Sequence, residues 1–130
     1  MSQNEAVNYW ISSALEDWSI SQTLYSDHKF NYALFFLQLT IEKLIKAVHI
    51  SKYDEHPLYI HNIVLLAQKA GLEFDEAAME DLKEISSFNV SARYDSYKRD
   101  FYQKSTAEFA KKWMDKGQAI REKLLWMLSH

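Results

Sequence analysis

Hydrophobic residues recur at alternating spacings of three and four along the first part of the chain. Such a spacing puts one apolar stripe on one face of an α-helix, so it predicts a helix from about residue 4 to 26. The segment Ser2-Gln3-Asn4-Glu5 has the pattern of a capping box, in which the serine and glutamate side chains satisfy free N–H groups at a helix start. The stripe consists of Val7, Ile11, Ala14, Trp18, Ser21 and Tyr25.

A second helix is predicted over residues 29–51, with Asp27 as its N-terminal cap. Apolar residues cover nearly its whole circumference. Such a helix lies at the centre of a bundle or is shared with a second subunit. Because a bundle of four or five helices does not easily enclose one of its own members, we expect a homodimer contact in this region.

Two shorter helices are expected in the middle of the chain. Pro57 disfavours helix just before it, which ends the preceding pattern. The following stripe predicts a helix at about 59–70, with Gly71 as its C-terminal stop. Asp75 can cap the next predicted helix, over about 76–87.

Residues 88–104 show no clear period and are predicted to form a long connection. Connections of this length are usually functional or disordered. This one is too aromatic for disorder, since it contains Phe88, Tyr94, Tyr97, Phe101 and Tyr102.

A last helix is expected from a second capping box, Ser105-Thr106-Ala107-Glu108, to about residue 128. Gly117 falls on its packing face and can permit close helix approach. The pattern as a whole predicts an all-α fold: an up-and-down antiparallel bundle of four to five helices in a single domain, residues 1–130.

Composition agrees with a helical bundle and excludes several chemistries. The 130 residues include two glycines, one proline and no cysteine, too few turn formers for most strand-rich folds. Without cysteine there is no disulfide, thiolate nucleophile or cysteine zinc site. The histidines lack metal-ligand spacing, so neither a metal nor a cofactor is expected. No signal-peptide pattern or membrane-length apolar run is visible, which favours a cytoplasmic protein without membrane contact.

Charge is distributed unevenly along the chain. Residues 1–80 contain five Lys and Arg against eleven Asp and Glu, whereas residues 81–130 contain ten against seven. The basic bias of the second part can favour an anionic partner, or it can simply mark a solvated helix face.

The richest candidate site is the stretch from Ala92 to Tyr102, where basic and aromatic residues alternate. This mixture suits an anionic ligand with rings that stack, such as a nucleotide or single-stranded RNA. Arginine and tyrosine also dominate protein–protein hot spots. A third interpretation is a loop that is held against the bundle by its own aromatic side chains.

Four further polar residues can line a groove beside this stretch. Glu42 and Lys46 form an i,i+4 pair, which marks either the solvent strip of the second helix or a polar groove. Asp17 gains importance if Arg93 reaches it, because a guanidinium can bind a carboxylate through two hydrogen bonds. His61 is either a capping or packing residue, or a general base or hydrogen-bond donor facing the loop.

The order and spacing of these residues resemble the HEPN domain. The similarity covers nearly the whole chain, and it includes His61 with Val64 and Leu65, and the Ala92-Arg93-Tyr94 signature before the last helix. The resemblance implies a five-helix bundle, commonly dimeric, in prokaryotic cytoplasm. In the first two helices it is carried by Trp10, Ala14, Asp17, Trp18, Phe30, Tyr32, Ala33, Phe36, Gln38, Glu42, Lys43 and Lys46.

The resemblance also implies a functional context. Many family members accompany a minimal nucleotidyltransferase in toxin–antitoxin pairs, and the catalytic members are metal-independent ribonucleases with an Arg-x(4–6)-His motif. Here the positions after Arg93 where that histidine would fall hold Lys98, Arg99 and Asp100. Without the imidazole, the usual base for activating a ribose hydroxyl is missing.

We therefore predict a non-catalytic module that binds a nucleotide, RNA or a nucleotidyltransferase partner. The alternatives are a ribonuclease toxin with a degenerate motif and a purely structural dimeric interaction protein in which Arg93 is buried against Asp17 or Glu42. The predicted ligand-binding residues are Arg93, Tyr94, Tyr97, Lys98, Arg99, Lys46, Glu42, Asp17 and His61.

Overall fold

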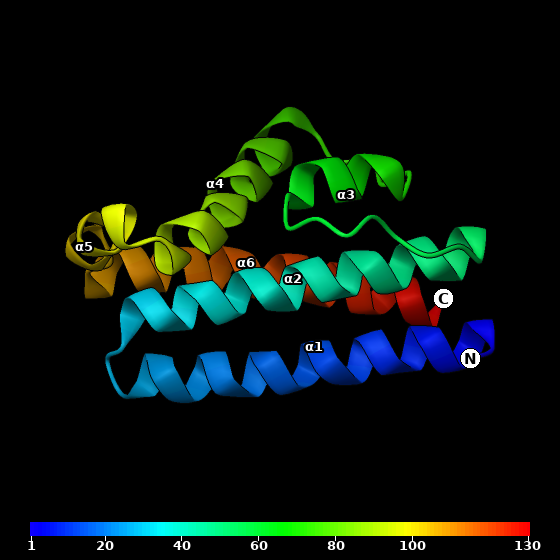
Figure 1. Cartoon of the computed structure of the whole chain (residues 1–130), viewed down its shortest axis with the longest axis horizontal. Helices are drawn as coiled ribbons and strands as arrows, with labels where there is room; N and C mark the ends of the chain where they lie inside the picture. The colour runs from blue at the N-terminus through cyan, green and yellow to red at the C-terminus, as the bar shows by residue number, and fades with distance from the viewer.

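The computed structural model describes all residues, 1–130, as an all-α bundle of six helices. Three long helices, α1, α2 and α6, lie side by side, and α3 and α4 lie on the side of α2 that faces away from α1 (Figure 1). Both chain termini lie at the same end of the bundle (Figure 1). None of the six helices is both long and apolar enough to cross a lipid bilayer. The helices are α1 (Gln3–Ser26), α2 (Phe30–Tyr53), α3 (Ile63–Lys69), α4 (Glu76–Arg93), α5 (Asp95–Lys104) and α6 (Ala107–Ser129).

The first two helices form an antiparallel hairpin that begins at a capped end. The Ser2 hydroxyl accepts a hydrogen bond from the N–H of Glu5 at 3.2 Å, which confirms the serine half of the predicted capping box; the Glu5 carboxylate makes no return hydrogen bond. The prediction that Asp27 caps the second helix is wrong, because Asp27 ends α1 and Lys29 precedes α2. His28 makes the tight turn between them with a φ of 59°.

Helix α2 lies at the centre of the bundle and is largely enclosed by its own chain. It contacts α1, α6, α4 and α3, and its fully buried residues include Leu37 and Ile41. Phe35, Phe36 and Leu39 are only partly buried, so an apolar strip of α2 still reaches the surface. The homodimer contact expected from this helix stays a prediction.

Gly117 brings α6 close to α2, as its place on the predicted packing face indicated. A Cβ atom at this position would overlap the side chain of Leu37. The second glycine, Gly71, ends the α3 region with a φ of 69°, a conformation that side-chain-bearing residues rarely adopt. The stop predicted at Gly71 is thus confirmed.

The irregular connection predicted over residues 88–104 is wrong. Helix α4 continues to Arg93, a single non-helical residue follows at Tyr94, and α5 occupies Asp95–Lys104. The aromatic residues explain why this segment is fixed: the rings of Phe88 and Phe101 stack with centroids 5.4 Å apart. Phe88 also meets the ring of Trp113 on α6 edge-on at 5.9 Å.

Two predicted helix starts also shift. The cap of the last helix is Thr106, whose hydroxyl accepts from the N–H of Phe109, and not Ser105. Ser105 is instead buried and donates to the carbonyl of Phe101, which closes the end of α5. Helix α3 begins at Ile63 rather than near residue 59, because the Asn62 side chain caps it there.

Candidate functional site

Three buried polar residues lie one turn apart on the same face of α2: Gln38, Glu42 and Lys46. The carboxylate of Glu42 accepts a hydrogen bond from Lys46 Nζ at 3.1 Å and one from Gln38 Nε2 at 3.0 Å. Burying a carboxylate and an ammonium group is costly unless they pair and their remaining hydrogen bonds are satisfied. The solvent-strip alternative for Glu42 and Lys46 is therefore wrong, since both are buried, but neither of them lines a groove.

His61 extends this cluster to the surface. Its Nδ1 lies 3.0 Å and 3.2 Å from the two carboxylate oxygens of Glu42, and its backbone carbonyl accepts from Gln38 Nε2 at 3.0 Å. The side chain is 52% exposed. With the proton on Nδ1 donated to Glu42, the Nε2 atom is left as an accessible donor or acceptor.

The position of His61 is set by the start of α3. The Asn62 side chain accepts from the N–H groups of Val64 and Leu65, both at 3.1 Å. The next residue, Ile63, donates its N–H to the hydroxyl of Ser86 on α4 at 3.1 Å. The chain just after His61 is therefore held by hydrogen bonds on two sides.

Asn89 on α4 joins this cluster to Arg93. Its Nδ2 donates to Gln38 Oε1 at 3.0 Å, and its Oδ1 accepts from a guanidinium N–H of Arg93 at 3.3 Å. Asn89 is buried, whereas Arg93 is exposed. We call the six connected residues the polar network: Lys46, Glu42, His61, Gln38, Asn89 and Arg93.

Beside Arg93, the short break and the start of α5 present a basic-aromatic surface. Its members, all exposed, are Arg93, Tyr94, Tyr97, Lys98 and Arg99. Of these cations Lys98 approaches a carboxylate, with Nζ 3.6 Å from Asp95. The exposure of Arg93 disagrees with the alternative in which that guanidinium is buried against Asp17 or Glu42.

Asp17 lies apart from the polar network. Its carboxylate is 2.6 Å from Lys43 Nζ, and Lys43 also donates to the hydroxyl of Ser13 at 2.7 Å. Lys43 follows Glu42 in α2, so its side chain leaves the helix about 100° away from that of Glu42. The predicted pair of Asp17 with Arg93 is not formed.

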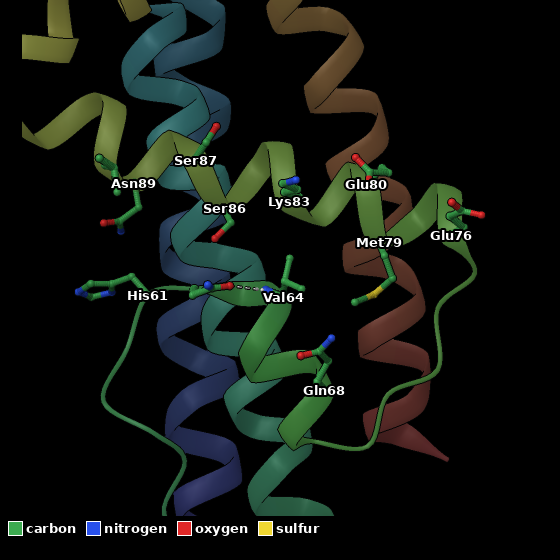
Figure 2. A pocket seen from close by; sticks show the side chains of 12 residues that line it. His61, Val64, Gln68, Glu76, Met79, Glu80, Lys83, Ser86, Ser87 and Asn89 are labelled. Atoms are coloured by element: carbon green, nitrogen blue, oxygen red, sulfur yellow. Dashed lines mark hydrogen bonds between the residues drawn. The ribbon is translucent and has the colours of Figure 1, made fainter.

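A groove of about 720 Å³ lies between α3 and α4 and meets the polar network at one end. His61 and Asn89 lie at that end, and Glu76 and Glu80 lie at the other (Figure 2). Val64, on α3 between the two ends, belongs to its apolar lining (Figure 2). The volume is in the range of small-molecule sites.

Lys111, on the exposed face of α6 and outside the polar network, has a raised pKa. The causes are its hydrogen bond with Asp115 and the negative charge of that carboxylate. No three His, Cys, Asp or Glu side chains gather closely enough to hold a metal ion.

The sequence prediction missed Asn89 as a member of the site, and it noted Gln38 only as part of the family resemblance. A signal for Asn89 does exist: it follows Leu82 and Ile85 on the buried stripe of α4, where a polar residue needs a partner. The partner, Gln38, is 51 residues away. Local spacing therefore cannot identify the pair.

Comparison with known proteins supports the fold and identifies the family. The crystal structure of TT1696 from Thermus thermophilus superposes with a TM-score of 0.76 and 18% sequence identity, covering 91% of this chain and 94% of that one. No curated protein sequence matches the chain significantly. The sequence model of the HEPN domain matches residues 7–125, nearly the whole chain. The chain therefore belongs to the HEPN domain family.

Proposed function

We propose that this HEPN domain binds a nucleotide or single-stranded RNA at the basic-aromatic surface without cleaving it. The observation that carries the proposal is the setting of Arg93. Its guanidinium is exposed, yet it is tied through Asn89 and Gln38 to the buried part of the polar network. A cation held in this way loses less conformational freedom when it binds a phosphate.

The surroundings of Arg93 fit such a ligand. Lys98 and Arg99 supply further positive charge, and exposed Tyr94 and Tyr97 offer rings for base stacking. Stacking on aromatic side chains and attraction of the phosphate backbone are the two usual sources of affinity for single strands. Arginine can also bind a phosphate through two parallel hydrogen bonds.

The non-catalytic part of the proposal rests on the residues after Arg93. The first turns of α5 place Lys98, Arg99 and Asp100 where the ribonuclease motif of the family has its histidine. None of these positions carries the imidazole that the family's motif uses as its general base.

The test is a titration of labelled short single-stranded RNA, followed by fluorescence anisotropy. Arg93→Ala is expected to weaken binding about tenfold or more, and Lys111→Ala, which removes one exposed lysine from α6, to leave it nearly unchanged. Binding should also weaken with added salt, because phosphate contacts release counterions. Absence of binding, or equal affinity in the Arg93→Ala variant, contradicts the proposal.

One observation favours a ribonuclease as the second candidate. The imidazole of His61 is held by the buried carboxylate of Glu42 and keeps Nε2 accessible, an arrangement suited to a general base. This candidate requires RNA cleavage in the presence of a metal chelator, lost in His61→Ala. Intact RNA after long incubation at high protein concentration rejects it.

The basic-aromatic surface also suits a protein partner, since tyrosine and arginine are enriched at interface hot spots. A minimal nucleotidyltransferase in a toxin–antitoxin pair is the partner that the family suggests. Co-purification with a nucleotidyltransferase encoded beside this chain, lost on Arg93→Ala and Tyr97→Ala, supports this alternative. The predicted homodimer is tested separately by light scattering during size-exclusion chromatography, where a mass near 15.4 kDa rejects it.

A further inference from the structure

We propose that α5 is a strap that opens by local unfolding between two fixed ends, while the rest of the bundle stays folded, and that a bound single strand of RNA holds it closed. The closed strap keeps Lys98 and Arg99 on a helix next to Arg93, whereas the open strap no longer positions them. The inference rests on the proposed RNA binding and adds how that surface is regulated.

Helix α5 folds back against α4 and is attached there by two side-chain contacts. The ring of Phe101 stacks on Phe88 with centroids 5.4 Å apart, and Lys104 Nζ lies 3.1 Å from a carboxylate oxygen of Glu84. Tyr94 is the only residue between the two helices, and its backbone is extended, with a φ of −102° and a ψ of 129°. The closed position therefore depends on one aromatic contact and one exposed ion pair with α4.

Few other interactions stabilise the strap. Phe101 is the only buried residue of this ten-residue helix, and the other nine are exposed. Tyr94 offers no side-chain cap to the first N–H groups of α5, whereas Asp75 caps α4 and Thr106 caps α6. An isolated helix shorter than about 12–15 residues is only marginally stable in water. Segments with few buried apolar contacts are the first to open locally, so α5 is the helix expected to open before the others.

The helices on both sides of the strap do not depend on it. When Phe101 leaves, Phe88 keeps its edge-on contacts with Trp113 and Phe109, at 5.9 Å and 6.0 Å between centroids. The start of α6 keeps its own cap, because the Thr106 hydroxyl accepts from the N–H of Phe109 at 3.2 Å. The opening is thus confined to the residues between α4 and α6.

The cations of the basic-aromatic surface lie on both sides of the boundary between bundle and strap. Arg93 is held on α4 by its 3.3 Å hydrogen bond with Asn89, whereas Lys98 and Arg99 belong to the strap. A strand whose phosphates contact Arg93 and a strap cation together binds the closed form alone. Binding then raises the closed population by mass action, and a strap that is mostly open lowers the apparent affinity for RNA.

Hydrogen–deuterium exchange of the full chain, followed by mass spectrometry, tests the opening. The amides of the strap are expected to exchange at least about tenfold faster than those in the interior of α4 and α6. With a short single-stranded RNA at about a hundred times its Kd, exchange in the strap should slow by up to about a hundredfold, because the open form does not bind.

Two matched variants of α4 show whether the strap depends on its own contacts. Glu84→Gln and Asp81→Asn each remove one carboxylate and one ion pair, but Glu84 pairs with the strap and Asp81 pairs with Lys116 of α6 at 3.0 Å. Glu84→Gln should speed exchange in the strap about two- to fivefold, as expected for the loss of an exposed ion pair. Asp81→Asn should leave exchange in the strap unchanged.

A third variant links the opening to RNA affinity. Phe101→Ala removes the one buried side chain of the strap and should leave it mostly open, with RNA affinity reduced about tenfold although no proposed RNA contact is changed. Protection of α4 and α6 should be retained, which shows that the bundle is still folded. Phe101→Leu keeps an apolar side chain in this place and should restore most of the affinity.

The outcomes separate this inference from the proposed function. Exchange in the strap as slow as in α4 and α6 overturns the inference, and so does exchange that RNA does not slow although RNA binds through Arg93. If Phe101→Ala unfolds the whole bundle, equal exchange of the strap in Glu84→Gln and Asp81→Asn overturns it instead. If RNA does not bind, the proposed function and the closing by RNA fail together, while exchange in the unbound chain still decides whether α5 opens.

Discussion

Asn89 donates a hydrogen bond of 3.0 Å to Gln38, and both side chains are buried between α4 and α2. The substitution Asn89→Ala leaves the Gln38 side-chain oxygen without its donor. It also removes the acceptor of the hydrogen bond that holds Arg93. We expect a loss of about 1–3 kcal/mol in the free energy of unfolding, measured by urea denaturation with tryptophan fluorescence. Ser87→Ala, an exposed change on the same helix, is the control and should change stability by less than about 0.5 kcal/mol.

The same variant should also bind RNA more weakly, although Arg93 is still present. This second readout distinguishes an anchor from a merely structural residue. If Asn89→Ala unfolds more easily but binds RNA as tightly as the original chain, Asn89 does not position Arg93.

Glu42 is the charge on which the buried part of the network depends. Glu42→Gln leaves the ammonium group of Lys46 buried without a counter-charge, and breaking such a pair typically costs about 3–5 kcal/mol. The double variant Glu42→Gln, Lys46→Met should be more stable than Glu42→Gln alone, because it removes the unpaired charge as well. Asp115→Asn, which breaks the exposed pair with Lys111, serves as the control and should change the stability far less than Glu42→Gln.

Gly117→Ala is expected to destabilise the bundle by about 1–3 kcal/mol, despite the better helix propensity of alanine. The added methyl group would overlap Leu37 and force α6 away from α2. Thermal unfolding followed by circular dichroism measures the change. In a Leu37→Ala background the same substitution should cost much less, and an equal cost in both backgrounds would show that Leu37 is not the obstacle.

Asp17 is expected to act on stability and not on ligand binding. Asp17→Asn and Lys43→Met should show a coupling of about 0.5–3 kcal/mol in a double-mutant cycle, because the two groups are 2.6 Å apart. The RNA affinity of Asp17→Asn should equal that of the original chain. A loss of RNA affinity as large as that caused by Arg93→Ala would show that Asp17 contributes to the binding site.

The long helices could be predicted from the sequence because their apolar stripes are long and regular. The stripes of α1 and α6 have enough buried positions to define a period, and α2 is recognised by its nearly continuous apolar character. Helix α5 could not be recognised in this way. Phe101 is its only buried residue, so no stripe exists, and the segment is fixed by aromatic contacts with Phe88.

The site was predicted in its parts but not in its connections. Glu42, Lys46, His61 and Arg93 were singled out by residue type, and the structure joins them in one network. The link runs through Gln38 and Asn89, two neutral amides far apart in the sequence. Their importance comes from burial, which depends on how α4 crosses α2 and not on local pattern.

Tyr94 is both the C-cap residue of α4 and the N-cap residue of α5. The carbonyl end of one helix and the amide end of the next therefore meet at a single residue, and their opposite partial charges, about half an elementary charge each, largely offset one another. An anion bound at this corner, as proposed, would be attracted by the side chains and not by a helix dipole. Each substitution of Arg93, Lys98 or Arg99 by alanine should therefore reduce the salt dependence of RNA affinity by the amount expected for one phosphate contact.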